Sequence, residues 1–114
     1  MDRPFRGAIV FALASAVLHL FAFIPGGFAS AAFMMIPFGI VYFLIAAGLG
    51  RGWRWFGYIA FLIFAIGGVV ALGFVWADHP VPGWWFLLIM AADWLAAGAL
   101  FLALWQDPVR EAEA

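Results

Sequence analysis

The run from Trp84 to Trp105, WWFLLIMAADWLAAGALFLALW, carries a single charged residue, Asp93. At about 1.5 Å of rise per residue, a helix of this length crosses the ~30 Å hydrocarbon core of a bilayer. An ionised carboxylate at that depth is unfavourable by about 3 kcal/mol on insertion scales, so an acid inside a membrane helix is treated as a candidate functional site. The run therefore predicts a transmembrane helix whose Asp93 faces the protein interior.

The composition places the whole chain in the same class. Of 114 residues, 69% are hydrophobic and 10% are charged, and the mean hydropathy is +1.15. Five basic and six acidic side chains are too few to cover the surface of a soluble domain of this size. The chain has no basic cluster of the kind that binds nucleic acid, and without cysteine it has no disulfide, thiolate nucleophile or cysteine-ligated metal.

Four apolar runs divide the sequence and predict one all-α transmembrane domain, a four-helix bundle, over residues 1–114. Between the runs stand groups of residues that end helices, namely Pro25-Gly26-Gly27, Gly50-Arg51-Gly52 and the loop 77–83. The predicted helices cover approximately residues 5–24, 31–49, 53–76 and 84–105.

A weak internal repeat appears at a shift of 50 residues. It aligns Gly7, Ile9 and Phe11 with Gly57, Ile59 and Phe61. If the repeat reflects a duplication, the bundle consists of two tandem helical hairpins with the same orientation.

The arginines predict the orientation, because cytoplasmic loops near membrane helices carry an excess of basic residues. Two arginines precede the first run, two lie between the second and third, and one follows the fourth: Arg3, Arg6, Arg51, Arg54 and Arg110. We therefore expect a multi-pass protein of a bacterial-type cytoplasmic (inner) membrane with both termini in the cytoplasm.

The beginning of the chain has an alternative interpretation. Arg3 and Arg6, the apolar run, Pro25 and the small residues 29–31 together resemble a secretory signal that is cleaved within residues 1–31. The run from Gly7 to Ile24 is longer than the ~7–15 residues of a typical signal core, which favours a retained helix.

Three polar residues inside the runs are predicted to lie at similar depths. Counted from the cytoplasmic helix ends, Ser15 lies about 15 Å deep, Asp93 about 18 Å and His19 about 21 Å. His19 shares a helix face with the small residues Ala8, Ala12, Ser15 and Ala16. Because small residues allow close helix packing in lipid, we expect this face to point inward and His19 to approach Asp93 within hydrogen-bonding or water-bridged distance.

Helix irregularities are predicted at the same level. Pro37, Gly67 and Gly68 fall about 18–22 Å from the cytoplasmic ends. Pro37 removes a backbone donor and is expected to kink the second helix, whereas the two glycines leave space beside the third. The candidate site therefore comprises His19, Asp93 and Ser15, with Pro37, Gly67 and Gly68 next to it.

Three roles for this polar group remain open. His19 and Asp93 hold the first and fourth helices together by hydrogen bonding, or they form a site that couples to protons or ions, or His19 ligates a pigment or haem. The segment Ser15–His19 resembles the small-residue-xxx-His pattern of light-harvesting polypeptides, whose histidine ligates bacteriochlorophyll. His79, in the loop Asp78-His79-Pro80, is expected to be a solvated turn residue. The cofactor, if there is one, stays unassigned, and no metal site is predicted.

The motifs of enzymes and of known small transporters are absent from the sequence. There is no nucleophile elbow, phosphate loop or two-histidine metal spacing. A small multidrug-resistance transporter carries a carboxylate in its first helix, and a quinone-linked thiol oxidase requires cysteines. We therefore expect a non-enzymatic accessory, assembly or structural subunit of a larger membrane complex, with other membrane subunits or its own copies as partners. The alternative is a proton-coupled transporter that acts as a homo-oligomer through Asp93.

Overall fold

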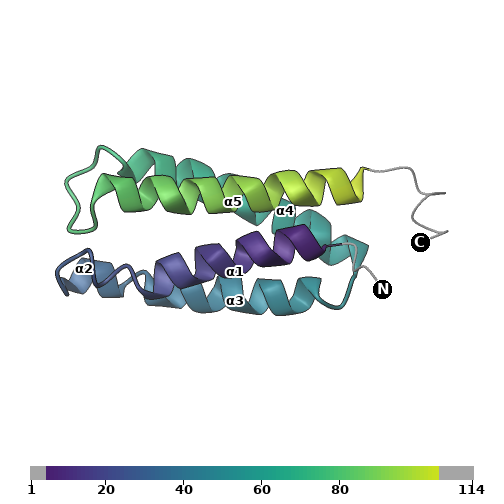
Figure 1. Cartoon of the computed structure of the whole chain (residues 1–114), viewed down its shortest axis with the longest axis horizontal. Coiled ribbons are helices and arrows are strands. Elements are labelled where there is room, and N and C mark those ends of the chain that lie inside the picture. The colour runs from purple at the N-terminus through teal and green to yellow at the C-terminus, as the bar shows by residue number, and fades with distance from the viewer. Residues whose placement is uncertain (1–4, 106–114) are drawn as a thin grey trace.

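The computed structural model describes residues 5–105, and this part of the chain is helical throughout, with turns but no strands. Three segments are long and apolar enough to cross a membrane, namely residues 30–49, 54–74 and 83–104, and the first helix is apolar but shorter. Figure 1 shows the helices lying side by side in a bundle of about 50 × 22 × 18 Å. The helices are α1 (Arg6–Leu20), α2 (Ser30–Phe33), α3 (Ile36–Leu49), α4 (Arg54–Phe74) and α5 (Gly83–Leu104).

The first helix is shorter than predicted. It ends at Leu20 instead of residue 24, and consecutive turns follow. Pro25 has no N–H to continue the helical hydrogen bonding, and the chain then turns through left-handed conformations at Gly27 (φ 67°) and Phe28 (φ 62°). The other predicted helix ends agree with the structure to within about two residues.

The sequence suggested that Pro37 kinks a continuous second helix, but the structure shows no continuous helix there. The second run is instead divided at Met34 and Met35, and α3 begins at Ile36 with Pro37 in its first turn. A proline is tolerated there because the first N–H groups of a helix have no helical partner.

The helices form two consecutive hairpins, as the sequence repeat suggested. In the first hairpin α1 packs against α3, in the second α4 packs against α5, and α1 and α5 join the two. The expectation that the first and fourth predicted helices are neighbours is thus confirmed. In contrast, α3 and α4 touch only slightly although a short loop joins them.

Small side chains are buried on both α1 and α5, which pack against each other. Ala8, Ala12 and Ala16 on α1 are buried, and so are Ala96 and Ala97 on α5. Alanines at helical spacing allow two helices to approach closely, and in lipid such packing is a main source of helix association.

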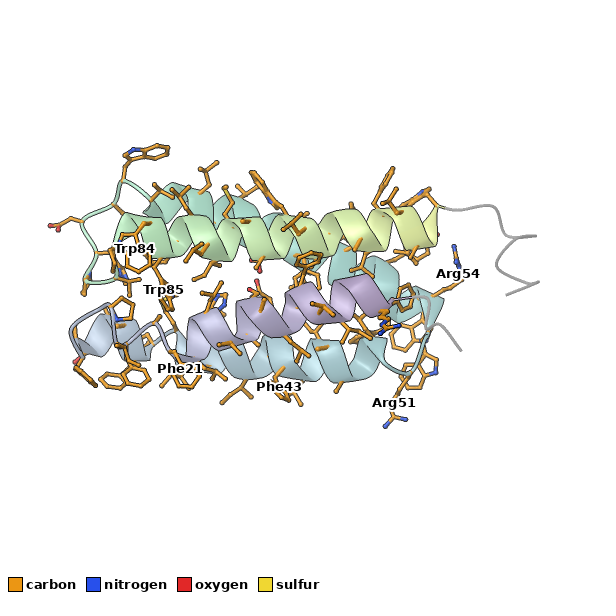
Figure 2. All side chains as sticks on the ribbon, viewed as in Figure 1. Phe21, Phe43, Arg51, Arg54, Trp84 and Trp85 are labelled. Atoms are coloured by element: carbon orange, nitrogen blue, oxygen red, sulfur yellow. The ribbon has the colours of Figure 1, made fainter. Side chains whose placement is uncertain are left out.

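Side-chain hydrogen bonds to helix ends reinforce the bundle. The Arg54 guanidinium donates to the carbonyl of Leu104 near the end of α5, and Nε1 of Trp85 donates to the carbonyl of Leu18 at 2.9 Å near the end of α1. Last-turn carbonyls lack helical partners, so both bonds satisfy groups that would otherwise remain unpaired. Figure 2 shows Arg51 and Arg54 at one end of the bundle and Trp84 and Trp85 at the other.

Candidate functional site

Asp93 lies inside the bundle and accepts hydrogen bonds from two other helices. Its side chain is 0% exposed. Oδ1 accepts a hydrogen bond from the Ser15 hydroxyl on α1, and Oδ2 accepts one from the Tyr42 hydroxyl on α3 at 3.1 Å. A single carboxyl group therefore connects three helices.

His19 joins this group through Ser15 and not through Asp93. Its Nδ1 lies 2.8 Å from the backbone carbonyl of Ser15 and 3.4 Å from the Ser15 hydroxyl. Among the described residues the connection from His19 to Asp93 runs through Ser15 and not through a direct hydrogen bond. An approach of His19 to Asp93 through a bridging water stays a prediction. Ser15 is one helical turn closer to the cytoplasmic end predicted from the sequence, and its short side chain reaches the carboxylate first.

Tyr42 was not among the residues selected from the sequence. Its ring lies edge-on to the His19 ring, with centroids 4.8 Å apart, and its hydroxyl reaches Asp93. One signal was present: Tyr42 is one of two tyrosines in the chain and lies in the middle of an apolar run. A buried tyrosine hydroxyl usually requires a hydrogen-bond partner, and that requirement points to a buried acceptor.

Gly67 provides the space that the polar group occupies. A Cβ atom at this position would lie 2.7 Å from Oδ2 of Asp93 and would also collide with the Tyr42 hydroxyl. Its neighbour Gly68 makes room for the Trp94 indole, whose Nε1 donates to the carbonyl of Ala65 at 3.3 Å. The two glycines thus have separate roles, one toward the carboxylate and one toward a tryptophan.

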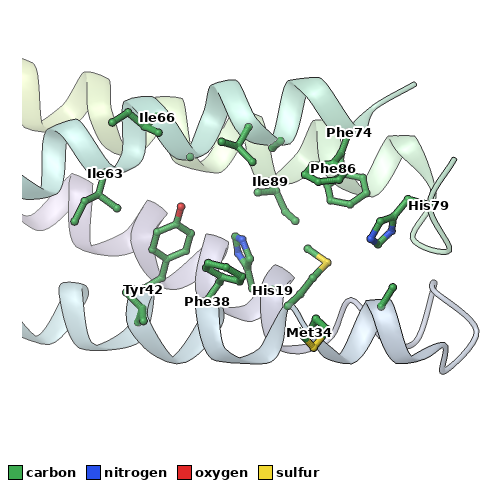
Figure 3. Close-up of a pocket in the computed structure, with 16 residues that line it drawn as sticks. His19, Met34, Phe38, Tyr42, Ile63, Ile66, Phe74, His79, Phe86 and Ile89 are labelled. Carbon is green, nitrogen blue, oxygen red and sulfur yellow. The ribbon is translucent and has the colours of Figure 1, made fainter. Parts of the chain in front are cut away.

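A cleft of about 520 Å³ opens between α3 and α4, the two helices that barely touch. Figure 3 shows Phe38 and Tyr42 on one wall, Ile63 and Ile66 on the other, and His19 behind them. The lining is apolar apart from His19, Tyr42 and His79. The polar group around Asp93 therefore borders the cleft through Tyr42 and His19.

His79 is packed more closely than the expected solvated turn residue. Its ring lies edge-on to Phe74 and Phe86, at centroid distances of 5.5 and 5.2 Å. Its Nδ1 accepts a hydrogen bond from the Val81 N–H at 3.1 Å. His79 therefore closes the loop end of the cleft and does not join the polar group around Asp93.

Within residues 5–105 no three His, Cys, Asp or Glu side chains come together in a way that would hold a metal ion. Every buried side-chain nitrogen or oxygen in the same region has a hydrogen-bond partner. The site can thus hold helices together and can present His19 and Tyr42 to a molecule in the cleft. A pigment or haem on His19 stays a hypothesis.

Comparison of the chain with known proteins gave no match. No protein-family model matches the chain, and neither a curated protein nor a solved structure is significantly similar to it. Any function must therefore be argued from the residues of this chain.

Proposed function

We propose that the protein is a multi-pass membrane protein that acts without catalysis, as an accessory or assembly subunit of a larger membrane complex. In this proposal the α2–α3 segment, α4 and α5 each cross a bacterial-type cytoplasmic membrane, and the shorter α1 crosses it together with the turns that follow Leu20. Both termini then lie in the cytoplasm. Arg51 and Arg54 lie together at one end of the bundle, where α1 begins and α5 ends. That end is the cytoplasmic one by the positive-inside rule. Arg3 and Arg110, which supported the same orientation, lie outside the described residues.

The observation that supports the proposal is that the hydrogen bonds of the buried Asp93 carboxyl group are all made within the chain. Both Asp93 oxygens accept hydrogen bonds from hydroxyl groups of the same chain, and the side chain is fully buried. In a low-dielectric interior, such an arrangement holds helices in one register, as interhelical polar contacts in membranes do at about 0.6–2 kcal/mol each. A carboxylate used in this way supports a packing role.

The outer face of α5 is suited to a partner helix. Ala91, Leu95 and Gly98 follow one another on this face at helical spacing, and all three are exposed. A Cβ atom on Gly98 would meet nothing within 4 Å, so the backbone is open to close approach. Small exposed residues at such positions allow a second membrane helix to pack tightly.

Copurification in mild detergent tests the proposal. The tagged full-length protein should bring down a distinct membrane complex, and Gly98→Leu should reduce the yield of that complex about tenfold or more. Gly73→Leu is the matched control, since Gly73 also has open space around its Cβ position but lies on α4. If the wild-type protein elutes alone or as a homodimer, the accessory role is rejected.

A second function, proton-coupled transport by a homo-oligomer, is supported by the position of Tyr42. Tyr42 lines the cleft and its hydroxyl contacts Asp93, so the carboxyl group lies directly behind the cleft wall. Asp93→Asn distinguishes the two functions, because an amide can hydrogen-bond but does not titrate in this pH range. The variant should still copurify its partners if the accessory role is correct. Loss of transport in proteoliposomes, with the homo-oligomer intact, would support the transporter.

A further inference from the structure

At its buried side, the cleft between α3 and α4 has a polar atom that the chain leaves unused, Nε2 of His19. His19 is 9% exposed, and its hydrogen bonds within residues 5–105 all involve Nδ1. No buried side-chain nitrogen or oxygen in this region lacks a partner, so the unpaired Nε2 must be accessible. Because His19 lines the cleft, and Figure 3 shows its ring directed into it, the accessible side is the cleft.

The hydrogen-bonding character of this atom follows from Nδ1. A backbone carbonyl only accepts hydrogen bonds, so the Nδ1 that lies 2.8 Å from the Ser15 carbonyl carries the proton. A neutral imidazole with its proton on Nδ1 presents a lone pair at Nε2. The cleft therefore offers an acceptor to a molecule that brings a donor.

The remainder of the lining restricts that molecule further. The side chains next to His19 are aliphatic, aromatic or methionine, and His79 stands apart at the loop end of the cleft. None of the lining residues carries a formal charge when histidine is neutral. A charged head group would lose its hydration here without gaining an ionic partner. A donor group that is neutral and belongs to an otherwise apolar molecule fits the lining.

The size and position of the cleft favour a lipid over a protein segment. Its volume of about 520 Å³ lies in the range of ~300–1,000 Å³ that is usual for sites of small molecules. A helix is about 10 Å across with its side chains, and α3 and α4 are joined by a loop of a few residues at one end, which restricts how far they can separate. A single hydrocarbon chain needs no such separation.

We propose that this cleft binds one neutral, hydroxyl-bearing lipid, whose hydroxyl donates a hydrogen bond to Nε2 of His19. The lipid chain packs against Phe38 and Met34 on one side and Ile66 and Val70 on the other. The Tyr42 ring packs edge-on against the His19 imidazole in the wall of the cleft. This site is separate from the partner surface proposed on α5.

Native mass spectrometry of the purified full-length protein tests the lipid site. The probes are 1-monoolein, which has two hydroxyls, and methyl oleate, which has the same chain and no hydroxyl. The wild-type protein should retain one monoolein per chain and about tenfold less methyl oleate. Equal retention of the two probes, or no retention of either, would overturn the proposal.

Protein variants locate the binding. Ile66→Trp should abolish monoolein retention by filling the cleft, whereas Leu62→Trp, one turn away on α4 and outside the lining, should not change it. Both positions are exposed in the chain, at 62% and 58%, so the larger side chain does not disturb the core. Unchanged retention by Ile66→Trp would show that the lipid binds elsewhere and would reject the cleft.

A variant of His19 examines the hydrogen bond separately from the shape of the cleft. His19→Phe keeps an aromatic ring and removes the acceptor, so the preference for monoolein over methyl oleate should fall about fivefold to tenfold. Circular dichroism and a monodisperse gel-filtration peak establish that the variant is folded. A preference that is unchanged in the folded variant contradicts the role given to Nε2. A copurifying protein that is lost on Ile66→Trp, with no monoolein retained by the wild type, would assign the cleft to a partner helix instead.

Discussion

The Tyr42 hydroxyl donates a hydrogen bond to Oδ2 of Asp93 at 3.1 Å, and this bond joins residues that are 51 positions apart in the chain. It links α3 to α5, two helices that belong to different hairpins. Together with the Ser15 hydroxyl on α1, it leaves neither oxygen of the buried carboxyl group without a donor. The stability of the bundle should therefore depend on the accepting atoms of Asp93.

Asp93→Leu should destabilise the protein more than Asp93→Asn. Leucine offers no acceptor, so the Ser15 and Tyr42 hydroxyls lose their partner in the interior, at a cost of about 1–3 kcal/mol each. Asparagine retains one carbonyl oxygen, and its amide can donate to the lone pairs of a hydroxyl, so its cost should stay below about 2 kcal/mol. Thermal unfolding in detergent measures both, and equal melting temperatures for the two variants would contradict the role assigned to the hydrogen bonds.

Gly67→Ala should destabilise the protein although alanine is the better helix former. The added methyl group would collide with the Tyr42 hydroxyl and approach Asp93, and overpacking of this kind costs about 1–3 kcal/mol. Gly98→Ala is the control, because its methyl group meets nothing and should leave stability unchanged or raise it by up to about 1 kcal/mol. The opposite order of the two melting temperatures would show that the site is less tightly packed than described.

Trp85→Phe should lower stability by about 0.5–1.5 kcal/mol, because it removes the hydrogen bond to the Leu18 carbonyl near the end of α1. Trp84 is the natural control, being exposed and without a side-chain hydrogen bond to the described part of the chain. Trp84→Phe should therefore change the unfolding midpoint less than Trp85→Phe does. A larger loss for Trp84→Phe would indicate that the neighbouring indole contributes through contacts outside this chain.

Orientation in the membrane can be tested by cysteine labelling, since the chain has no native cysteine. In intact cells or spheroplasts, Asp78→Cys should react with a thiol reagent that does not cross the membrane. Trp53→Cys, at the arginine-containing end, should react only after the membrane is permeabilised. Labelling in the reverse pattern rejects the orientation, and labelling of both positions rejects a transmembrane arrangement.

Much of this architecture could be predicted because apolar runs and their interruptions are local properties of the sequence. The run around Asp93 predicted α5, and the glycines at Gly50 and Gly52 predicted the turn between α3 and α4. The similar depths of His19 and Asp93 led to the correct pair of adjacent helices, α1 and α5. Depth alone, however, does not determine which side chain on a helix face reaches its partner.

The parts that could not be predicted depend on packing between distant segments. The choice of Ser15 over His19 as the Asp93 donor is decided by side-chain length and helix rotation. The contribution of Tyr42 depends on how α3 lies against α1, which no local pattern specifies. The cleft exists because α3 and α4 separate despite being consecutive, whereas consecutive elements usually lie in contact.

The separation of Ser15 and Asp93 by 78 residues has a consequence for biosynthesis. Since chains are made from the N-terminus, α1 and α3 are synthesised before α5. Asp93 has neither of its hydroxyl donors until α5 docks beside α1 and α3. A chain whose α5 has been made but has not docked therefore exposes an acidic residue that the folded bundle conceals.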